Sequence, residues 1–381
     1  MKEEYILENG NNLAGMAAID SGVKCAGVYP LTPSSETADY LAEEMVKRGL
    51  VFKQKEDEIA AIGFTKGGAI DGRAMTITSG PGLALMSENI GDIFQKQLPV
   101  VILDVMRGGP STGLPTRISQ GDFSFLKHPC PGDVRSIVLA PGSPLECYTL
   151  TCLAFDWADY FMQPIFIASD ELIGHVDVRI SLDDLKNAPK NTVKRRTDFS
   201  ETYQPYARRE GESPILNPFF TGKRYHITGL RYDHNGFPTE DAVLCQQAID
   251  DMFNKVNTHL DMLERNETYR LNDAEYLIVC VGSVGLSAMD AIDRLRESEH
   301  PIKVGMFRPL TIWPSPEKAI EELAKKFPKE RILVAELNMG QYKEEIERLT
   351  GYRPINFLGQ ANGRPLSPHQ IEEKIRSMCH D

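Results

Sequence analysis

The stretch RAMTITSGPGLALMSENIGDIFQKQLPVVILDV, residues 73–105, contains the pattern that determines the fold. A strand-like run at 73–78 is followed by a glycine–proline turn, a helical segment at 83–94 and a second apolar run at 100–105. Strands connected through a helix pair in parallel, because such a crossover is too long for a hairpin. An uninterrupted apolar strand is buried on both faces, so the stretch predicts a parallel sheet covered by helices on both sides.

The same alternation continues on both sides of this stretch. In the first half of the chain, further helices are expected at 12–21, 34–47, 59–70 and 144–160, and strands at 25–29, 136–140 and 164–168. Near the C-terminus, strands are expected at 276–281, 304–307, 332–335 and 355–358, and helices at 287–297, 316–326 and 341–349. We therefore predict an α/β domain at 1–190 and a smaller one at 273–381. Residues 191–272 are polar and are predicted to form a connector with one amphipathic helix at 241–264.

Composition excludes several classes of function. The 381 residues include 42 Lys and Arg against 54 Asp and Glu, a net charge of -12, which disfavours nucleic acid and anionic membranes as partners. No uncharged apolar run approaches the roughly 18 residues that span a bilayer, and the first residues do not have the order of a signal peptide. We expect a soluble protein of the cytoplasm.

Neither the cysteines nor the histidines predict a metal site in this chain. The seven cysteines are scattered and no CxxC occurs, which argues against zinc ribbons and iron–sulfur loops. The eight histidines form no HExxH or HxxxH pattern. Reduced cysteines in cores or near the surface are the favoured interpretation.

Ligands of open parallel sheets bind beyond the carboxyl ends of the strands. Four segments are expected at such ends: 29–35, 78–82, 107–117 and 282–285. Three of them belong to the first domain and could surround one site. The fourth, GSVG, lacks the third glycine of a dinucleotide fingerprint, so a simple turn is favoured there.

The first two segments could each approach a ligand. Thr32 would place a hydroxyl near a helix N-terminus, which suits an anionic or carbonyl-bearing ligand. A rigid entry loop with Ser34 as helix N-cap is the favoured alternative. In the second segment, Ser79, Gly80, Pro81 and Gly82 form a tight turn whose glycines let the backbone approach a ligand. It is not a phosphate loop, because no Lys-Ser or Lys-Thr follows.

The third segment is a loop with two arginines. Arg107 and Arg117 could each hold a carboxylate in a bidentate contact, although a surface arginine is the commoner outcome. The loop also spells G-x-S-x-G at 109–113. Pro110 and Pro115 disfavour the helix that a nucleophile elbow needs, so a serine nucleophile is not predicted.

Glu58 begins the alanine-rich helix at 59–70 and leaves two interpretations open. An acidic residue in a first turn usually complements the helix dipole. If the side chain points inward, a buried carboxylate beside a heteroaromatic nitrogen can share a proton with it. The spacing does not decide between them.

Several long stretches carry a resemblance to a known family. They are YPLTPSSE at 29–36, EDEIAAIGFTKGGAIDGRAMTITSGPGLALMSENIG at 56–91, RGGPSTGLPTRISQGD at 107–122, FRPLTIWPSP at 307–316 and AELNMGQ at 335–341. On these the chain resembles the alpha subunits of 2-oxoacid:ferredoxin oxidoreductases, most closely the 2-oxoglutarate branch. The similarity covers both domains and is weakest in the connector.

The resemblance implies a thiamine diphosphate enzyme divided between chains. The fold would be α/β, with a pyrimidine-binding domain of mainly parallel sheet and a smaller domain like the transketolase C-terminal domain. No GDG occurs here, so a beta subunit would bring that motif and Mg²⁺, and the 4Fe-4S clusters would lie on partner subunits. Coenzyme A and ferredoxin are further expected partners, with or without small gamma and delta subunits.

The resemblance also implies roles for single residues. Glu58 corresponds to the glutamate that activates the coenzyme through its aminopyrimidine ring, with Ser79, Gly80 and Pro81 as walls of the ring pocket. Thr32 and Arg107 would bind the oxoacid, and Arg117 is a second candidate for a substrate carboxylate.

The implied reaction is oxidative decarboxylation of 2-oxoglutarate to succinyl-CoA with electrons to ferredoxin, or its reverse. A pyruvate or branched-chain 2-oxoacid enzyme and a non-catalytic nucleotide-binding protein remain alternatives. Two departures from the family concern Leu31, where isoleucine is usual, and residues 95–98, which lack the acidic residue often found there.

Overall fold

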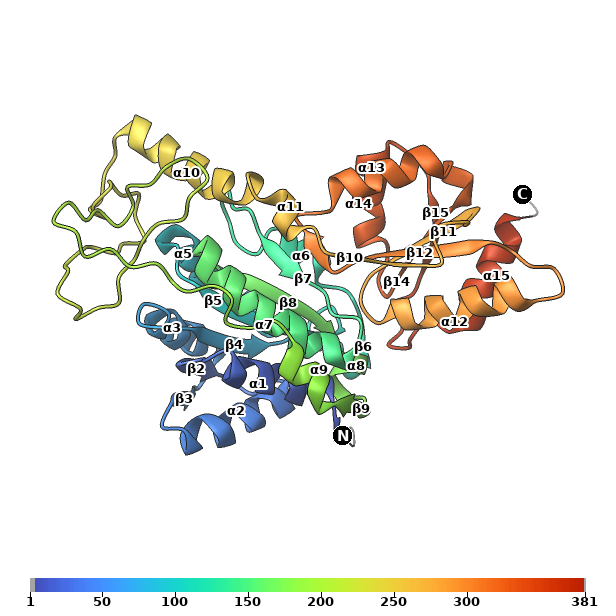
Figure 1. The fold of residues 1–381 in the computed structure, drawn as a ribbon, viewed down its shortest axis with the longest axis horizontal. Coiled ribbons are helices and arrows are strands. Elements are labelled where there is room, and N and C mark those ends of the chain that lie inside the picture. The colour runs from blue at the N-terminus through green and yellow to red at the C-terminus, as the bar shows by residue number, and fades with distance from the viewer. Residues whose placement is uncertain (1–3, 380–381) are drawn as a thin grey trace.

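The computed structural model describes residues 4–379 and contains two α/β parts and a long irregular connector (Figure 1). The larger sheet has the strand order β13-β7-β8-β5-β4-β2-β3, with β6 paired to β5 outside this path. Its strands are β2 (Cys25–Val28), β3 (Val51–Gln54), β4 (Ala74–Thr78), β5 (Val100–Gly108), β6 (Leu114–Ile118), β7 (Ile137–Leu139), β8 (Ile165–Asp170) and β13 (Thr311–Trp313). Only the pairs β13–β7 and β5–β6 are antiparallel, so the predicted mainly parallel sheet is confirmed.

Helices cover both faces of this sheet (Figure 1). One face carries α1 (Gly10–Asp20), α2 (Ser35–Lys47) and α7 (Pro144–Phe161), and the other α3 (Glu58–Gly68), α4 (Gly80–Leu85), α5 (Ser87–Lys96) and α6 (Phe123–Lys127). The side chains of β5 alternate between two cores: Val101 and Leu103 enter the first, and Val100 and Ile102 the second. This two-sided burial is the reason for the uninterrupted apolar run.

Three local expectations differ from the structure. The helix expected at 83–94 is two helices, α4 and α5, which meet at Met86. Ser34 precedes α2 as expected, but its hydroxyl donates to the Leu31 carbonyl instead of capping the helix. The expected loop at 107–117 contains β6, which folds back on β5. Gly113 permits that turn: its φ is +53°, and a Cβ there would lie 1.8 Å from the Gly108 oxygen.

The connector wraps around the first domain. A small two-stranded sheet consists of β1 (Tyr5–Glu8), near the start of the chain, and β9 (Val178–Ser181). The short helices α8 (Glu171–His175) and α9 (Leu182–Asn187) precede and follow β9. From α9 the chain runs irregularly to α10 (Ala242–Asn257) and α11 (Leu260–Leu263). Loops of this segment extend beyond α3 and α5 (Figure 1). The helix expected at 241–264 is thus present, with a break between α10 and α11.

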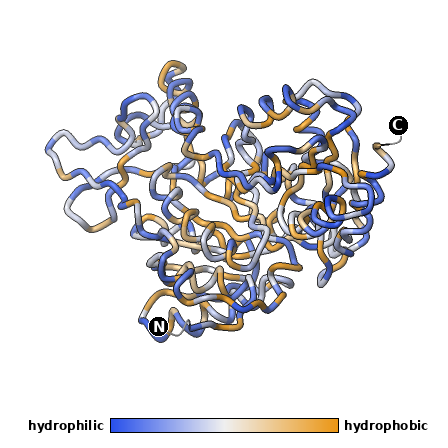
Figure 2. The backbone as a smooth tube through the Cα atoms, turned by 45° about the vertical axis from the view of Figure 1, so that its right-hand side comes forward, coloured by the Kyte–Doolittle hydropathy of each residue, from blue (hydrophilic) through white to orange (hydrophobic). Residues whose placement is uncertain are grey.

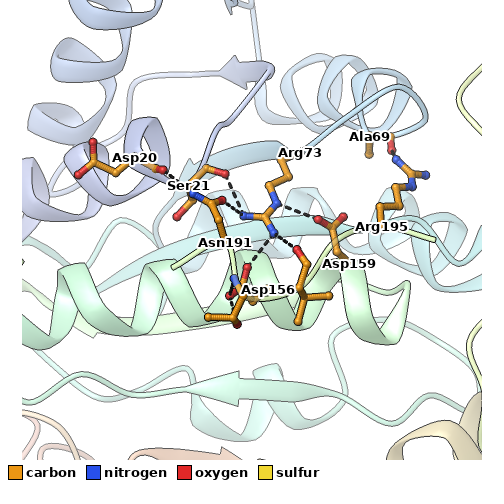
Figure 3. Close-up of polar contacts among 10 residues, drawn as sticks. Asp20, Ser21, Ala69, Arg73, Asp156, Asp159, Asn191 and Arg195 are labelled. Atoms are coloured by element: carbon orange, nitrogen blue, oxygen red, sulfur yellow. Dashed lines mark hydrogen bonds and ion pairs between the residues drawn. The ribbon is translucent and has the colours of Figure 1, made fainter. Parts of the chain in front are cut away.

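Arg73, just before β4, attaches the connector to the first domain (Figure 3). Its guanidinium pairs with Asp156 at 2.7 Å and Asp159 at 2.8 Å, both on α7. It also donates to the carbonyls of Ser21 and Val193 and to the Asn191 side chain. Every N–H of the side chain therefore has a partner, although the side chain is only 11% exposed.

We predict that Arg73→Met destabilises the protein by about 3–5 kcal/mol, because it leaves two buried carboxylates without their cation. The midpoint of thermal unfolding measures the loss. Arg294→Met is the matched control, since Arg294 forms an exposed pair with Asp290 on one helix, and its midpoint should not change. Equal midpoints for the two variants would contradict the role of Arg73.

The second sheet has the order β10-β12-β11-β14-β15. Its strands are β10 (Asn266–Tyr269), β11 (Tyr276–Cys280), β12 (Val304–Pro309), β14 (Ile332–Glu336) and β15 (Asn356–Gly359), and only β10 runs antiparallel. Helices α12 (Val284–Glu297) and α15 (Pro368–Met378) cover one face, and α13 (Glu317–Lys326) and α14 (Gln341–Thr350) the other, with a 3-10 turn η1 (Lys329–Arg331). The smaller α/β part expected from the sequence is present. The division at 190 and 272 stays a prediction, although the pairing of β10 puts residues 266–269 in this sheet.

The two sheets are joined by more than the connector. After β12 the chain enters the first sheet as β13, which pairs with β7. Gln120, fully buried in the first domain, donates to the Val281 carbonyl at 2.8 Å and accepts from the Leu337 N–H at 3.1 Å. Arg308 pairs with Glu146 at 2.6 Å and Glu267 at 2.7 Å. The Gln120 contacts hold the carboxyl ends of β11 and β14 against the segment that follows β6, and Arg308 joins β12 to α7 through Glu146.

Hydropathy follows this architecture. Figure 2 shows apolar segments running through the interior of the two α/β parts, while the connector loops are largely hydrophilic. Within residues 4–379, no helix combines the length and apolar character needed to cross a bilayer.

Candidate functional site

Three of the four segments singled out in the sequence meet at the carboxyl edge of the large sheet. β2, β4 and β5 are parallel neighbours, so the segments that follow them leave the sheet on the same side. Arg107 is the last residue but one of β5. It donates from Nη1 to the Thr32 carbonyl at 2.6 Å, and this hydrogen bond joins the first segment to the third. The fourth, at Gly282, lies against Gln120 and Asp170 at the domain interface.

Glu58 points inward. It is the first residue of α3, after the N-cap Asp57, and is only 6% exposed. A Cβ on Gly82 would lie 2.7 Å from Glu58 Oε1 and 2.3 Å from Thr78 Oγ1, so the carboxylate packs directly beneath the glycine turn. No hydrogen bond or ion pair joins the Glu58 carboxylate to another side chain or backbone group within residues 4–379. Of the two orientations that the sequence left open, the structure has the buried one.

The turn after β4 provides backbone and one buried hydroxyl. Ser79 is fully buried and precedes α4, and its Oγ has no hydrogen-bond partner in the described chain. Gly80 and Pro81 are half-buried in the first turn of that helix. The segment thus places backbone and one unpartnered hydroxyl beside Glu58.

Arg107 and Thr32 form the next part of the site. Arg107 is 6% exposed, and its Nε is buried without a partner in the described chain. Thr32 is exposed and holds the guanidinium through its carbonyl. Arg107 therefore keeps donors available for an anion.

Arg117 lies apart from this group. It is exposed on β6, and no hydrogen bond or ion pair joins its side chain to another residue between 4 and 379. The chain at Gly363 packs on it from the second domain, where a Cβ would lie 2.8 Å from Arg117 Cβ. Arg117 is thus on the rim between the two domains. It precedes Ile118, which pairs with Arg107, but no hydrogen bond or ion pair in the described residues joins its side chain to Arg107 or Thr32.

Two aspartates at the site were not predicted. Asp104 on β5 is fully buried, and neither of its oxygens has a partner in the described chain. Burial and the neighbouring Asp122 raise the pKa of Asp104 well above its usual range. Burial also raises the pKa of Asp122 to about 6, against the opposing attraction of Arg107. The one sequence signal was an acidic residue inside the apolar run VVILDV.

Unpartnered polar atoms concentrate here. Ser79 Oγ, both oxygens of Asp104, Arg107 Nε and Asp122 Oδ2 are five of the 14 buried side-chain atoms without a partner in the described chain. Buried polar groups are nearly always hydrogen-bonded, so these five atoms need partners that the described chain does not provide, which suits a ligand-binding site. A cavity of about 620 Å³ between α7 and the connector contains none of these residues. No group of His, Cys, Asp or Glu in residues 4–379 is arranged to hold a metal ion.

Family descriptions match most of the chain. "Pyruvate flavodoxin/ferredoxin oxidoreductase, thiamine diP-bdg" matches residues 16–251, and "Pyruvate:ferredoxin oxidoreductase core domain II" matches 274–371. The 2-oxoglutarate synthase subunit KorA of Methanocaldococcus jannaschii is 36% identical over 98% of this chain and 100% of that protein. The ketoisovalerate oxidoreductase subunit VorB of Methanothermobacter thermautotrophicus is 30% identical over 98% and 97%.

A solved structure is also closely similar. It is a 2-oxoglutarate:ferredoxin oxidoreductase from Magnetococcus marinus with 2-oxoglutarate, coenzyme A and succinyl-CoA bound. The TM-score is 0.92 at 30% identity, and the match covers 99% of this chain. The chain spans 65% of the length of that solved chain.

Proposed function

The chain belongs to the 2-oxoacid:ferredoxin oxidoreductase family, and from this premise we propose that it is the alpha subunit of a 2-oxoglutarate:ferredoxin oxidoreductase. The enzyme would decarboxylate 2-oxoglutarate oxidatively, transfer the acyl group to coenzyme A as succinyl-CoA and pass the electrons to ferredoxin, or run in reverse. One observation carries the assignment of the site: the Glu58 side chain is buried against the Gly82 turn and its carboxylate has no hydrogen-bond partner in the described chain. Arg107 and Thr32, which are joined by a hydrogen bond, lie at the same edge of the sheet.

The residues around Glu58 fit thiamine diphosphate. The Glu58 carboxylate has no hydrogen-bond partner in the described chain, which suits a ring nitrogen with which it can share a proton. The Ser79–Gly82 turn offers backbone and the unpartnered Ser79 hydroxyl. When bound, the coenzyme would supply the nucleophilic carbon and the electron sink for loss of carbon dioxide. Glu58 would hold the proton at the ring nitrogen, and Gly82 would keep the carboxylate in place. Ser79, Gly80 and Pro81 would orient the ring.

The Arg107 guanidinium of this chain would bind the oxoacid. The free donors of Arg107 suit the carboxylate next to the carbonyl, in a charge-assisted contact. Thr32 would fix the guanidinium through its carbonyl and offer its hydroxyl to the substrate. Arg117 on the rim would attract the distal carboxylate of a dicarboxylic substrate.

The other half of the site would come from partner chains. We assign Mg²⁺ and the diphosphate to a beta subunit with a GDG motif, and the 4Fe-4S clusters to partner subunits, because this sequence contains neither GDG nor CxxC. Relatives named as subunits support an assembly. All seven cysteines are free, which supports a reducing compartment such as the cytoplasm.

The test is reconstitution. The chain is coexpressed with a GDG-bearing beta subunit from the same genome, and the purified complex is assayed for viologen reduction with coenzyme A and one oxoacid at a time. We expect kcat/KM for 2-oxoglutarate at least about tenfold above that for pyruvate or 2-oxoisovalerate. A preference for 2-oxoisovalerate would favour the branched-chain alternative, which the similarity to VorB supports. No reduction with any oxoacid would contradict the proposed enzyme.

A further inference from the structure

A buried amide on α1 binds the loop that carries Thr32. Asn11 is 1% exposed, and its Nδ2 donates to the Pro33 carbonyl at 2.8 Å. The carbonyl one residue earlier, that of Thr32, accepts from Arg107 at 2.6 Å. Two adjacent carbonyls of this loop are therefore held by two different side chains, of which Arg107 is the one assigned to the oxoacid.

Glu36, in the first turn of α2, determines which end of the Asn11 amide faces the loop. Its Oε2 accepts from the same Nδ2 at 3.0 Å. A carboxylate and a carbonyl can only accept hydrogen bonds, so the amide nitrogen, and not the amide oxygen, has to face both of them. Without Glu36, the amide loses one of the two acceptors that fix its orientation toward Pro33.

His175, the last residue of α8, holds Glu36 in turn. Its Nε2 lies 3.1 Å from Glu36 Oε1, and its Nδ1 forms a hydrogen bond with Glu171 Oε1 at 3.2 Å. With a carboxylate at each ring nitrogen, both nitrogens can donate only when the imidazole is protonated. The hydrogen bond to Glu171 and the charge of Glu36 accordingly raise the pKa of His175, against the opposing effect of burial.

The role of Glu36 is separable from the packing of the fold. Its side chain is 40% exposed, so it fills little of the core. The two helices are also joined without it, because the Thr37 hydroxyl donates to the Asn11 carbonyl at 2.8 Å. What Glu36 adds is a link in a continuous series of polar contacts that runs from α8 to Arg107.

We propose that Glu36 is a positioning residue for the oxoacid. Through Asn11 it holds the Thr32–Pro33 segment in place, and this segment holds the Arg107 guanidinium for the substrate carboxylate. The proposal rests on the proposed binding of the oxoacid by Arg107 and Thr32. Because the coenzyme would bind at the separate turn beside Glu58, Glu36 acts on the affinity for the oxoacid and not on that for the coenzyme.

The experiment compares the reconstituted complex with its Glu36→Ala variant. Viologen reduction gives KM and kcat for 2-oxoglutarate, and thiamine diphosphate titration gives the dissociation constant of the coenzyme. We expect KM to rise about tenfold, as for loss of a hydrogen bond to a charged group, while kcat and the coenzyme's dissociation constant stay within about twofold. Glu36→Gln should recover most of the affinity, because its amide oxygen can still accept from Asn11.

Two more variants test the series of contacts. His175→Gln should raise KM only about threefold, because a partly exposed ion pair contributes little. Combining it with Glu36→Ala should raise KM no further than Glu36→Ala alone, since His175 acts through Glu36. Glu43→Ala is the matched control: Glu43 is exposed on the same helix and pairs with Lys47, and KM should not change.

An active complex in which Glu36→Ala leaves KM within about twofold of the wild type would overturn the proposal. So would a variant in which KM, kcat and coenzyme binding all deteriorate together and glutamine restores none of them, because that pattern indicates a general disturbance of the fold. A wild-type complex that turns over no oxoacid would instead contradict the proposed function, and this inference with it.

Discussion

Glu58→Gln lowers kcat of the reconstituted complex by about a thousandfold, within the range of general acid–base contributions. Glutamine fills the same space under Gly82, so packing is retained. What it loses is the ability to share a proton with a ring nitrogen, which is the only role assigned to this side chain. The loss should appear in kcat with each accepted oxoacid, because the step precedes any discrimination between substrates.

The measurement is steady-state viologen reduction, accompanied by thiamine diphosphate titration of the complex to separate binding from turnover. Glu56→Gln is the matched control: Glu56 is an exposed glutamate two residues earlier, and the rate should remain that of the wild type. A Glu58→Gln complex with more than about a tenth of the wild-type kcat would refute the proton-sharing role.

Arg107→Met raises KM for 2-oxoglutarate by about a hundredfold or more, with a smaller effect on kcat. Truncating one member of a buried charged contact costs about 2–5 kcal/mol, and a hundredfold corresponds to about 2.7 kcal/mol. The Arg107 side chain is buried, and its one hydrogen bond within the described residues is to the Thr32 carbonyl. Lysine should recover only part of the loss, because it cannot reproduce both the contact to Thr32 and a bidentate contact to substrate.

Two further variants test whether the effect on KM is specific to Arg107. Arg353→Met, at an exposed arginine away from the site, should leave KM unchanged. Arg117→Met should raise KM for 2-oxoglutarate by about tenfold and leave KM for pyruvate unchanged, because in the proposed site only the distal carboxylate of a dicarboxylic substrate would reach Arg117. If Arg107→Met changed KM less than about fivefold, another group would have to bind the carboxylate.

The sequence predicted the parts of the fold that depend on local pattern. The apolar run of β5 was sufficient to predict a sheet that is buried on both faces. The segments that follow β2, β4 and β5 were predicted to lie at the carboxyl ends of their strands and to be able to surround one site. The hairpin of β6 was missed because its pairing depends on the left-handed Gly113, which no apolar alternation reveals. β13 was missed for a related reason, since its partner β7 is more than 170 residues earlier.

The candidate site was predictable only in part. Glu58, Thr32, Arg107 and the Ser79–Gly80–Pro81 turn were named from the sequence, and the structure places them on one edge; their roles remain predictions. Whether Glu58 pointed inward depended on packing against Gly82, which spacing cannot encode. Asp104 and Asp122 are 18 residues apart in sequence, and only the return of the chain through β6 makes them neighbours.

The pairing of β13 with β7 has a consequence for biosynthesis. The ribosome completes β7 at residue 139 but does not reach β13 until residue 311. At 5–20 residues per second, the delay is roughly 10–30 s. During that interval the nascent polypeptide exposes an unpaired strand border, the kind of surface that recruits other chains. We therefore expect the growing chain to be most prone to aggregation at β7 before residue 311 has been synthesised.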